Sequence, residues 1–475
     1  MYDGSAKTWA EKEFGTTLLG DVRRTRRLVS MAAGAARRPS GKISAVFDKT
    51  HEREGAYDFL ENPSIAADAV AESYFASTVE RARCESKALV YVVVDGSSIN
   101  LTDSRSERDF GPIGSPNCPA RGLKVMNALA VSREGVPLGL VDQLFWARPP
   151  RTKLTRAAAA KRNASRAFAD KEPSNFVRAT VNSVERLRRE GVHAWVIIDR
   201  EADNRDILLG LAKAKCLFTV RSHWDRHTVE EKLPLREVLR QQPSLGSYAI
   251  DIGRTGQRPA RRTTIDVRAK VVTLRFAKRK NQPLETLTLT AVWFRELNAD
   301  GGEPLDWLLY TNVPVTNAEQ ASEIVDSYRV RWRIEEFHRT WKQGECNVED
   351  AQLRSKEAVV KWATILAAVA TRIERLKYLS RNKPDQPAST ELAPLEIEAL
   401  KLDQRQRRPG SKKRKLPEIP TIYEATHWIA ELGGWIGMAN GPPGAATIAR
   451  GLERLAYFTE AIALARQPSE GGRRT

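Results

Sequence analysis

The sequence lacks the features that would place it in a membrane or stabilise it by disulfides. It has only four cysteines, widely separated and without a CxxC pair, namely Cys84, Cys118, Cys216 and Cys346. This spacing argues against both a disulfide framework and a thiolate zinc site. No apolar run approaches the ~18 residues needed to span a bilayer, and the opening MYDGSAKTWAEKEFG has no apolar signal-peptide core. We therefore expect a reduced, cytosolic protein with no membrane partner.

Acidic residues are also in short supply relative to basic ones. The chain has 77 Lys and Arg against 59 Asp and Glu, a formal net charge of +18 over 475 residues. Such an excess favours a polyanionic partner, nucleic acid before an anionic membrane. The length predicts about two to four domains.

The N-terminal 75 residues have a helical pattern. In GDVRRTRRLVSMAAGAARR, arginines surround an apolar stripe that includes Leu28, Val29 and Ala32. A charge run of this kind is either a solvated helix face or a phosphate-binding surface. The lack of matched acids keeps the second interpretation open.

Two buried strands are predicted, and each is followed by an aspartate. Leu89 to Val94 and Ala194 to Ile198 are unbroken apolar runs that end at Asp95 and Asp199. Residues of about 228–306 alternate with a period of two, which predicts an antiparallel insertion. With the surrounding helical patterns, the chain is predicted to be α/β with helical regions at both ends.

The predicted strand ends and one helix supply three carboxylates. If the strands are neighbours, Asp95 and Asp199 meet at one sheet edge, although an Asp often only caps a turn. YRVRWRIEEFHRTWKQG, residues 328–344, is predicted to be one helix. At about 100° per residue, four of its side chains project within roughly 60° of one another, namely Tyr328, Arg331, Glu335 and Lys342.

A stripe of three charges and a tyrosine is not a core pattern. It is either a salt-bridged surface, since Arg331 and Glu335 are four residues apart, or part of a site. Three carboxylates offer the hard oxygen ligands that suit Mg²⁺ or Mn²⁺. Neighbouring cations would then hold the phosphates of a nucleic acid that the carboxylates alone would repel.

The pattern Y-x2-R-x3-E-x6-K formed by these four residues resembles the signature of the IS-four family of DDE transposases. LGDVRRTRRLV, EGAYDFLENPS, VVVDGSS, IIDREAD, VRSHW and WIAELGGW also resemble family segments, in the same order. The resemblance covers essentially the whole chain and is patchy in the insertion and in residues 380–420.

This resemblance implies a ribonuclease-H-like fold, a mixed sheet flanked by helices, with Asp95, Asp199 and Glu335 as catalytic residues holding two Mg²⁺ ions, for which Mn²⁺ can substitute. Trp307 and Trp332 match positions that stack a flipped base, although Trp307 also fits a core position. The residues implied to contact phosphate or DNA are Tyr328, Arg331, Lys342, Arg221, Arg23, Arg24, Arg27, Arg37 and Lys42.

The implied organisation has three regions. Residues 1–75 would bind the DNA end, 76–383 would form the catalytic core, and 384–475 would supply a basic linker and a helical dimerisation domain. The C-terminal apolar stripe, with Leu452 and Leu455, also fits an ordinary core.

The implied function is cut-and-paste transposition by a homodimer in a synaptic complex on double-stranded DNA, working at the bacterial nucleoid. Two alternatives remain open: a ribonuclease-H-like nuclease without joining activity, and a domesticated, non-catalytic DNA-binding protein. The chain departs from the family pattern at Met126, where a histidine is expected, and at His223, where a lysine is expected. His223 and His227 have the i,i+4 spacing of zinc ligands, but no third ligand is near in the sequence.

Overall fold

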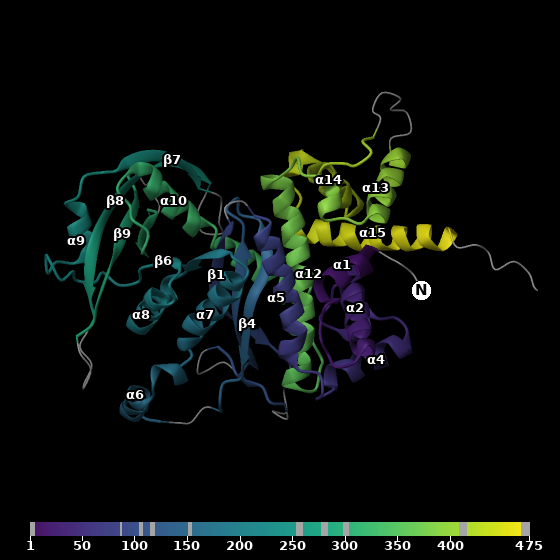
Figure 1. Ribbon diagram of the computed structural model, residues 1–475, viewed down its shortest axis with the longest axis horizontal. Helices are drawn as coiled ribbons and strands as arrows, with labels where there is room; N and C mark the ends of the chain where they lie inside the picture. The colour runs from purple at the N-terminus through teal and green to yellow at the C-terminus, as the bar shows by residue number, and fades with distance from the viewer. Residues whose placement is uncertain are drawn as a thin grey trace, which may run out of the picture.

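The computed structural model describes residues 5–85, 88–103, 108–114, 119–150, 154–252, 260–276, 284–297, 304–407 and 416–466. Cys118 lies outside these residues. In Figure 1 the antiparallel strands β7, β8 and β9 lie at one end of the molecule, the strands that include β1 and β4 lie in the middle, and the N- and C-terminal helices lie together at the other end. No helix in the described ranges is both long and apolar enough to cross a membrane.

Ten strands in the described part of the chain form a single mixed sheet. Its central part has the order β4-β3-β1-β5-β6, in which β1 pairs antiparallel with β3 and parallel with β5. The short β2 pairs with β3. These strands are β1 (Leu89–Asn100), β2 (Gly111–Pro112), β3 (Arg121–Val131), β4 (Pro137–Trp146), β5 (His193–Ile198) and β6 (Leu217–Arg221).

The order and the pairing, antiparallel on one side of β1 and parallel on the other, are those of a ribonuclease-H-like core. Both apolar runs predicted as buried strands form the adjacent parallel strands β1 and β5. Their side chains are buried because helices cover both faces of the sheet. The predicted fold class is confirmed.

The predicted antiparallel insertion extends this sheet beyond β6. Strand β10 pairs antiparallel with β6, and β9, β8 and β7 follow in that order, all antiparallel. Their alternating sequences fit strands with two different faces. The bounds are β7 (Gly246–Ile252), β8 (Arg261–Arg275), β9 (Thr286–Glu296) and β10 (Asp306–Thr311).

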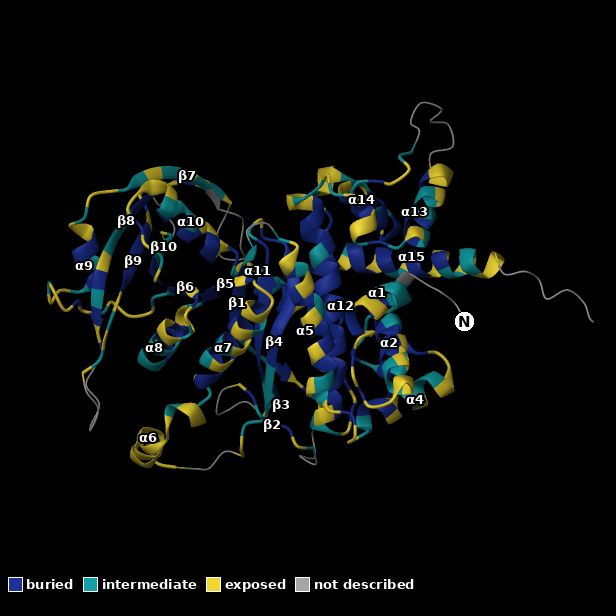
Figure 2. Cartoon of the chain, viewed as in Figure 1, coloured by how far each residue is buried: buried dark blue, intermediate teal, exposed yellow. Residues whose placement is uncertain are grey.

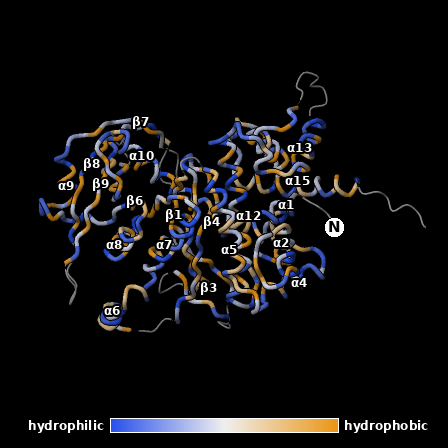
Figure 3. Tube along the Cα trace, in the orientation of Figure 1, coloured by the Kyte–Doolittle hydropathy of each residue, from blue (hydrophilic) through white to orange (hydrophobic). Residues whose placement is uncertain are grey.

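Two hydrophobic clusters fill the two faces of the sheet. Val93 and Ile197 belong to the cluster shared with α11, α12 and the terminal helices, whereas Val94 and Ile198 face α7 and α8. Figure 3 shows the apolar residues concentrated in the central strands and the helices against them. The helices between residues 156 and 382 are α6 (Arg156–Ser165), α7 (Ser174–Arg189), α8 (Arg205–Lys213), α9 (Leu235–Arg240), α10 (Ala318–Arg329), α11 (Trp332–Lys342) and α12 (Lys356–Asn382).

Helix α12 is the central support of the molecule. Ser355 caps its N-terminus by accepting a hydrogen bond from the Ala358 amide, and most of its residues are buried (Figure 2). It packs against β4, α11 and both sets of terminal helices. These are α1 (Ser5–Phe14), α2 (Val22–Arg37), α3 (Ile43–Val46), α4 (Thr50–Glu61) and α5 (Ala67–Arg83), together with α13 (Pro394–Arg407), α14 (Ile422–Leu432) and α15 (Ala445–Ala465).

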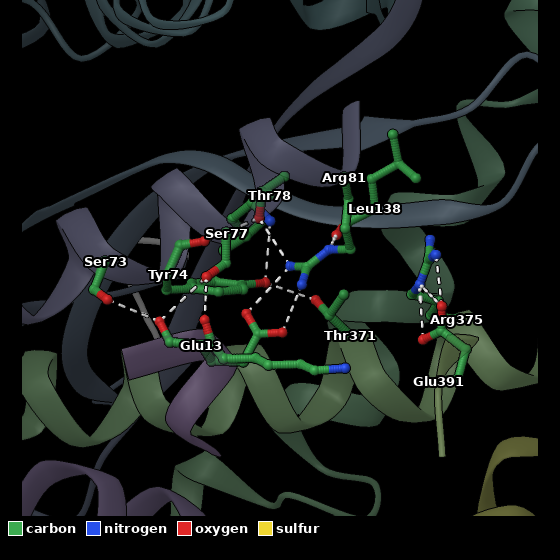
Figure 4. A network of polar contacts seen from close by, with 12 residues as sticks. Glu13, Ser73, Tyr74, Ser77, Thr78, Arg81, Leu138, Thr371, Arg375 and Glu391 are labelled. Carbon is green, nitrogen blue, oxygen red and sulfur yellow. Dashed lines mark hydrogen bonds and ion pairs between the residues drawn. The ribbon is translucent and has the colours of Figure 1, made fainter. Parts of the chain in front are cut away.

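A buried ion pair connects the N-terminal helices to the sheet (Figure 4). Arg81 of α5 donates to both carboxylate oxygens of Glu13 of α1, at 2.6 and 3.2 Å, and to the backbone oxygen of Leu138 in β4 at 2.6 Å. Tyr74 bonds Thr371 of α12 at 2.7 Å. Four elements, α1, α5, β4 and α12, are therefore held together by polar contacts inside the core.

Arg81→Ala should destabilise the protein strongly, because it leaves the Glu13 carboxylate buried without its partner. Breaking a buried pair in this way costs about 3–5 kcal/mol. The matched control is Arg83→Ala, whose ion pairs with Glu80 and Glu190 are exposed and worth at most about 1 kcal/mol. Thermal unfolding followed by calorimetry measures both, and equal losses of stability in the two variants would contradict the assignment.

Candidate active site

The two aspartates occupy equivalent positions on neighbouring parallel strands. Val94 of β1 pairs with Ile198 of β5, so that Asp95 and Asp199 come next in the same register. Because side chains alternate between the faces of a sheet, both lie on the face that carries Val93 and Ile197, the face covered by α11 and α12. The expected proximity of the two aspartates follows from backbone pairing alone.

A polar row crosses the sheet at this level. Asp95 is opposite Asn127 of β3, and Asn127 is opposite Gln143 of β4. On the other side, Ile198 pairs with Val220, which places Arg221 of β6 beside Asp199. The row therefore runs Gln143, Asn127, Asp95, Asp199, Arg221 over five strands.

Strand β1 does not end at Asp95, contrary to the sequence prediction. It continues to Asn100, paired with β3 as far as Gly122. The parallel partner β5 does end at Ile198, one residue before Asp199. Asp95 is thus held by hydrogen bonds of an ongoing antiparallel ladder, which fixes its backbone more firmly than a strand end would.

The single helix predicted for residues 328–344 is also a wrong prediction, because the structure has two helices. Helix α10 ends at Arg329 and α11 begins at Trp332. Between them the amide of Arg331 bonds the oxygen of Tyr328 at 3.0 Å, and that of Arg333 bonds Val330 at 2.9 Å, a tighter i→i+3 turn. The break lets α10 pack on the antiparallel strands while α11 packs on β1 and α12.

The structure brings one carboxylate of α11 to Asp95 and adds a residue that the sequence did not single out. Ligand atoms of Asp95, Glu335 and His338 lie within 4.8 Å of one another. His338 Nδ1 is 3.5 Å from Asp95 Oδ2. His338 lies three residues after Glu335, one helical turn away, and this spacing was the only signal for it in the sequence.

Asp199 is not one of the three residues of this cluster, and the strand register places it beside Asp95. Its carboxylate accepts a hydrogen bond from the Glu201 amide at 2.8 Å and caps the 3₁₀ turn Arg200–Ala202. Its charge acts on Asp95. Asp199 can therefore cap this turn and still contribute its charge to the site.

The carboxylates repel one another. Burial and the charges of Asp199 and Glu335 raise the pKa of Asp95 to about 8, against which the charge of Arg331 acts. A site of clustered carboxylates is stabilised by a cation, and oxygen donors suit Mg²⁺ or Mn²⁺. Asp95 and Glu335 are the carboxylates of this group that could hold it. His338 is buried, and desolvation together with the charges of Lys342 and Arg331 lowers its pKa to about 3.

Aromatic and cationic groups border the cluster on the side of the insertion. Trp307 stacks on Phe294 at 5.6 Å and meets Tyr328 edge-on at 5.3 Å, with the Arg221 guanidinium 6.0 Å from its ring centroid. Tyr328 is buried, and desolvation raises its pKa. Trp332, at 56% exposure, is open to solvent.

Arg331, which precedes α11, and Lys342 at its end each lie beside an acid. Arg331 donates to Glu335 at 2.9 Å, and the side chains of the two are 16% and 41% exposed. Lys342 is 3.7 Å from Glu349. Glu335 thus retains solvent access beside a guanidinium that offsets its charge.

The neighbouring Glu336 has a different environment, because it points about 100° away around the helix. Its carboxylate lies 3.1 Å from Lys377 and hydrogen-bonds the Tyr378 hydroxyl of α12. Lys377 also pairs with Glu374, which accepts from Thr340 at 2.6 Å. This network attaches α11 to α12.

Three of the arginines expected to contact DNA lie on α2, near its N-terminus. Arg23 is exposed. Arg24 donates to the Leu19 backbone oxygen at 3.1 Å, and the Arg27 guanidinium lies directly over Gly55 of α4, where a Cβ would clash with it.

Two further cations expected to contact DNA are engaged within the protein. Arg37 pairs with Glu460 of α15 at 3.4 Å, and Lys42 lies 3.6 Å from Asp350. The four side chains of these two pairs are 35–47% exposed. DNA phosphates would have to compete with these carboxylates.

The two departures from the family pattern have different settings. Met126 is buried on the opposite face of the sheet from Asp95, beneath Gly96. His223 donates its amide to the buried Asp203 at 2.8 Å, and its ring packs on Trp224.

Replacing either of the adjacent glutamates should separate metal binding from folding. Glu335→Gln should abolish Mn²⁺ binding and leave the melting temperature unchanged, whereas Glu336→Gln should keep Mn²⁺ binding and lose about 1–3 kcal/mol of stability. Calorimetric Mn²⁺ titration and thermal unfolding measure the two effects. Loss of both properties in one variant would show that the glutamates do not divide the roles.

Asp95→Asn should stabilise the metal-free protein at pH 8. Because the folded state raises the pKa of Asp95 from 3.8 to about 8, folding binds a proton between these values, and wild-type stability falls as pH rises through this window. The variant avoids this loss, a few kcal/mol at most. Its melting temperature should exceed that of wild type more at pH 8 than at pH 5. Asp58→Asn, at an exposed position of α4, is the control, and a difference independent of pH would refute the prediction.

Two protein-family models match the chain. The model described as Transposase DNA-binding matches residues 6–65, which contain α1 to α4. The model described as Transposase DDE domain matches residues 163–372, which contain Asp199, Glu335 and His338, whereas Asp95 precedes it. The chain therefore carries a transposase DNA-binding domain followed by a transposase DDE domain, the domain composition of a DDE transposase.

Proposed function

We propose that this protein is a cut-and-paste DNA transposase of the IS-four family, with Asp95, Asp199 and Glu335 as its catalytic residues. The observation that supports the proposal is that β1 and β5 align the two aspartates in register, while ligand atoms of Glu335 and Asp95 lie within 4.8 Å of one another. The motifs of the sequence closely resemble those of the transposase of transposon Tn-five.

The carboxylates would hold two Mg²⁺ ions, with Mn²⁺ as a substitute, and such ions activate an attacking hydroxyl and stabilise the leaving oxygen of an in-line displacement. The chain's own residues position the DNA. Arg221 and Arg331 flank the carboxylates and would bind the phosphates on either side of the scissile bond. Tyr328 packs against the ring of Trp307 and would support Arg221 and Arg331. Lys342 would add a third cation farther along α11.

Four reactions would follow at this site. Water cuts one strand and leaves a 3′-hydroxyl; that hydroxyl attacks the opposite strand to form a hairpin; water opens the hairpin; and the 3′-hydroxyl joins target DNA. All four are displacements at phosphorus, so that one constellation serves each of them. Exposed Trp332, and Trp307 after release from Phe294, would stack bases extruded by the hairpin bend.

The remaining parts of the chain would organise two DNA ends. Residues 1–75 would bind the end sequence through Arg23, Arg24, Arg27, Arg37 and Lys42. Residues 384–475 would dimerise, and the exposed Tyr457, Phe458 and Leu464 of α15 offer an apolar surface for this. Residues 76–383 would form the catalytic core, although α5 runs continuously across the first of these boundaries.

Asp95→Ala, Asp199→Ala and Glu335→Ala should each bind inverted-repeat DNA as wild type does and lose cleavage in Mg²⁺ by at least about 10³-fold. Gel shift and hairpin detection on end-labelled DNA measure the two properties. The matched control is Glu185→Ala, an exposed carboxylate on α7 across the sheet, which should cut normally. Full cleavage by any of the three variants would disprove the site, and cutting without joining of pre-cut ends would identify a nuclease.

A further inference from the structure

A buried chain of polar side chains leads from α12 to the candidate site. The Thr364 hydroxyl is 3.1 Å from Gln143 Oε1, Gln143 Nε2 donates to Asn127 Oδ1 at 2.8 Å, and Asn127 Nδ2 is 2.9 Å from His338 Nε2. His338 Nδ1 faces Asp95 Oδ2 at 3.5 Å. Each of the five residues is at most 9% exposed.

The direction of these hydrogen bonds decides the state of the imidazole. Because Gln143 donates to the oxygen of Asn127, the amide nitrogen of Asn127 faces His338. An amide nitrogen can donate a hydrogen bond but cannot accept one, so Nε2 of His338 must be the acceptor and must carry a lone pair. If the imidazole were doubly protonated, its Nε2–H would face the Nδ2–H of Asn127, and two donors would meet. The ring of His338 is therefore neutral, with its proton on Nδ1, which faces Asp95.

This arrangement settles a choice between two roles. Asp95, Glu335 and His338 have the mutual distances of a three-ligand metal site. However, a metal ligand needs a lone pair, and the lone pair of His338 is on Nε2, held by Asn127. The nitrogen that faces the cluster carries a proton instead.

The arrangement of these hydrogen-bonded side chains also suits a role in positioning Asp95. Gln143, Asn127 and Asp95 are cross-strand neighbours in one row of the sheet, and His338 reaches over this row from α11. Amides buried in an apolar core cost free energy unless all their hydrogen bonds are made. A row that ends at a carboxylate of the site fixes the position of that carboxylate relative to α11.

We propose that His338 is a positioning residue whose Nδ1–H orients the Asp95 carboxylate, with Asn127 and Gln143 fixing its tautomer, and that metal coordination is left to oxygen atoms. The inference rests on the proposed function for the identity of the site. The replacement of a partner of this kind typically costs about 10–100-fold in metal affinity or activity.

The first test uses Mn²⁺ as the probe, bound to the full-length protein and observed by pulsed electron paramagnetic resonance. We expect Mn²⁺ that is lost in Asp95→Ala and that shows no coupling to a directly coordinated nitrogen. A strong nitrogen coupling that disappears in His338→Asn would overturn the positioning role and leave the proposed function intact. Absence of any Asp95-dependent Mn²⁺ binding would overturn the proposed function, and the inference with it.

The second test uses the shape of the replacement. The amide nitrogen of Asn overlays Nδ1 of His and can still donate to Asp95, whereas Leu cannot. His338→Asn should cleave within about 5-fold of wild type, and His338→Leu should lose about 10–100-fold and need about tenfold more Mn²⁺ for half-maximal rate. Asn127→Leu, which frees the tautomer, should resemble His338→Leu.

The matched control is His427→Asn, a second buried histidine on α14 that is far along the chain from the site and bonds the Tyr423 oxygen. It should leave both the rate and the Mn²⁺ requirement unchanged. If His338→Leu keeps the wild-type rate and Mn²⁺ requirement, His338 is only a core residue and the proposal fails. Equal losses in His338→Asn and His338→Leu, at equal melting temperatures, would likewise refute it.

Discussion

The carboxylates on one face of the sheet repel one another, and the surrounding structure holds them close together despite this repulsion. Burial, together with the charges of Asp199 and Glu335, raises the pKa of Asp95. Such a cluster persists only if its backbone cannot relax. Continuous β1–β3 pairing and the parallel register with β5 provide that rigidity.

The third carboxylate depends on the attachment of a helix. Helix α11 carries Glu335 on one side and Glu336 about 100° away, and the second glutamate bonds α12 through Lys377 and Tyr378. An ion network on one side of α11 thus fixes the distance from Glu335 to Asp95 on the other. Burying charged residues such as Lys377 and Glu374 in α12 costs free energy. These residues also attach α11 to α12 and so hold Glu335 near Asp95.

The cations around the site are partly neutralised by the protein itself. Arg331 pairs with Glu335, Lys342 with Glu349, and Lys42 with Asp350. Under the proposed function, phosphates exchange with these carboxylates as DNA binds. Contacts exchanged in this way contribute to specificity and to salt dependence more than to net affinity.

The sequence by itself indicated the apolar segments of the two strands and singled out Asp95, Asp199 and Glu335. Apolar runs and spacing are local properties, and they predict β1 and β5, whereas the register that aligns Asp95 with Asp199 comes from the pairing of the two strands. It also indicated the antiparallel strands, because alternation is visible over a few residues.

Only the tertiary structure decided where α10 ends and α11 begins, how far β1 continues, what Glu336 bonds and that His338 lies beside Asp95 and Glu335. Each of these features depends on a partner that is distant in the sequence. The break between α10 and α11 depends on the different surfaces against which the two helices pack, and the length of β1 depends on its pairing with β3. The position of Glu336 depends on its contacts with α12, and that of His338 on its hydrogen bond with Asn127. Periodicity places a side chain on a face of its own element, but the neighbour that it meets there is set by packing.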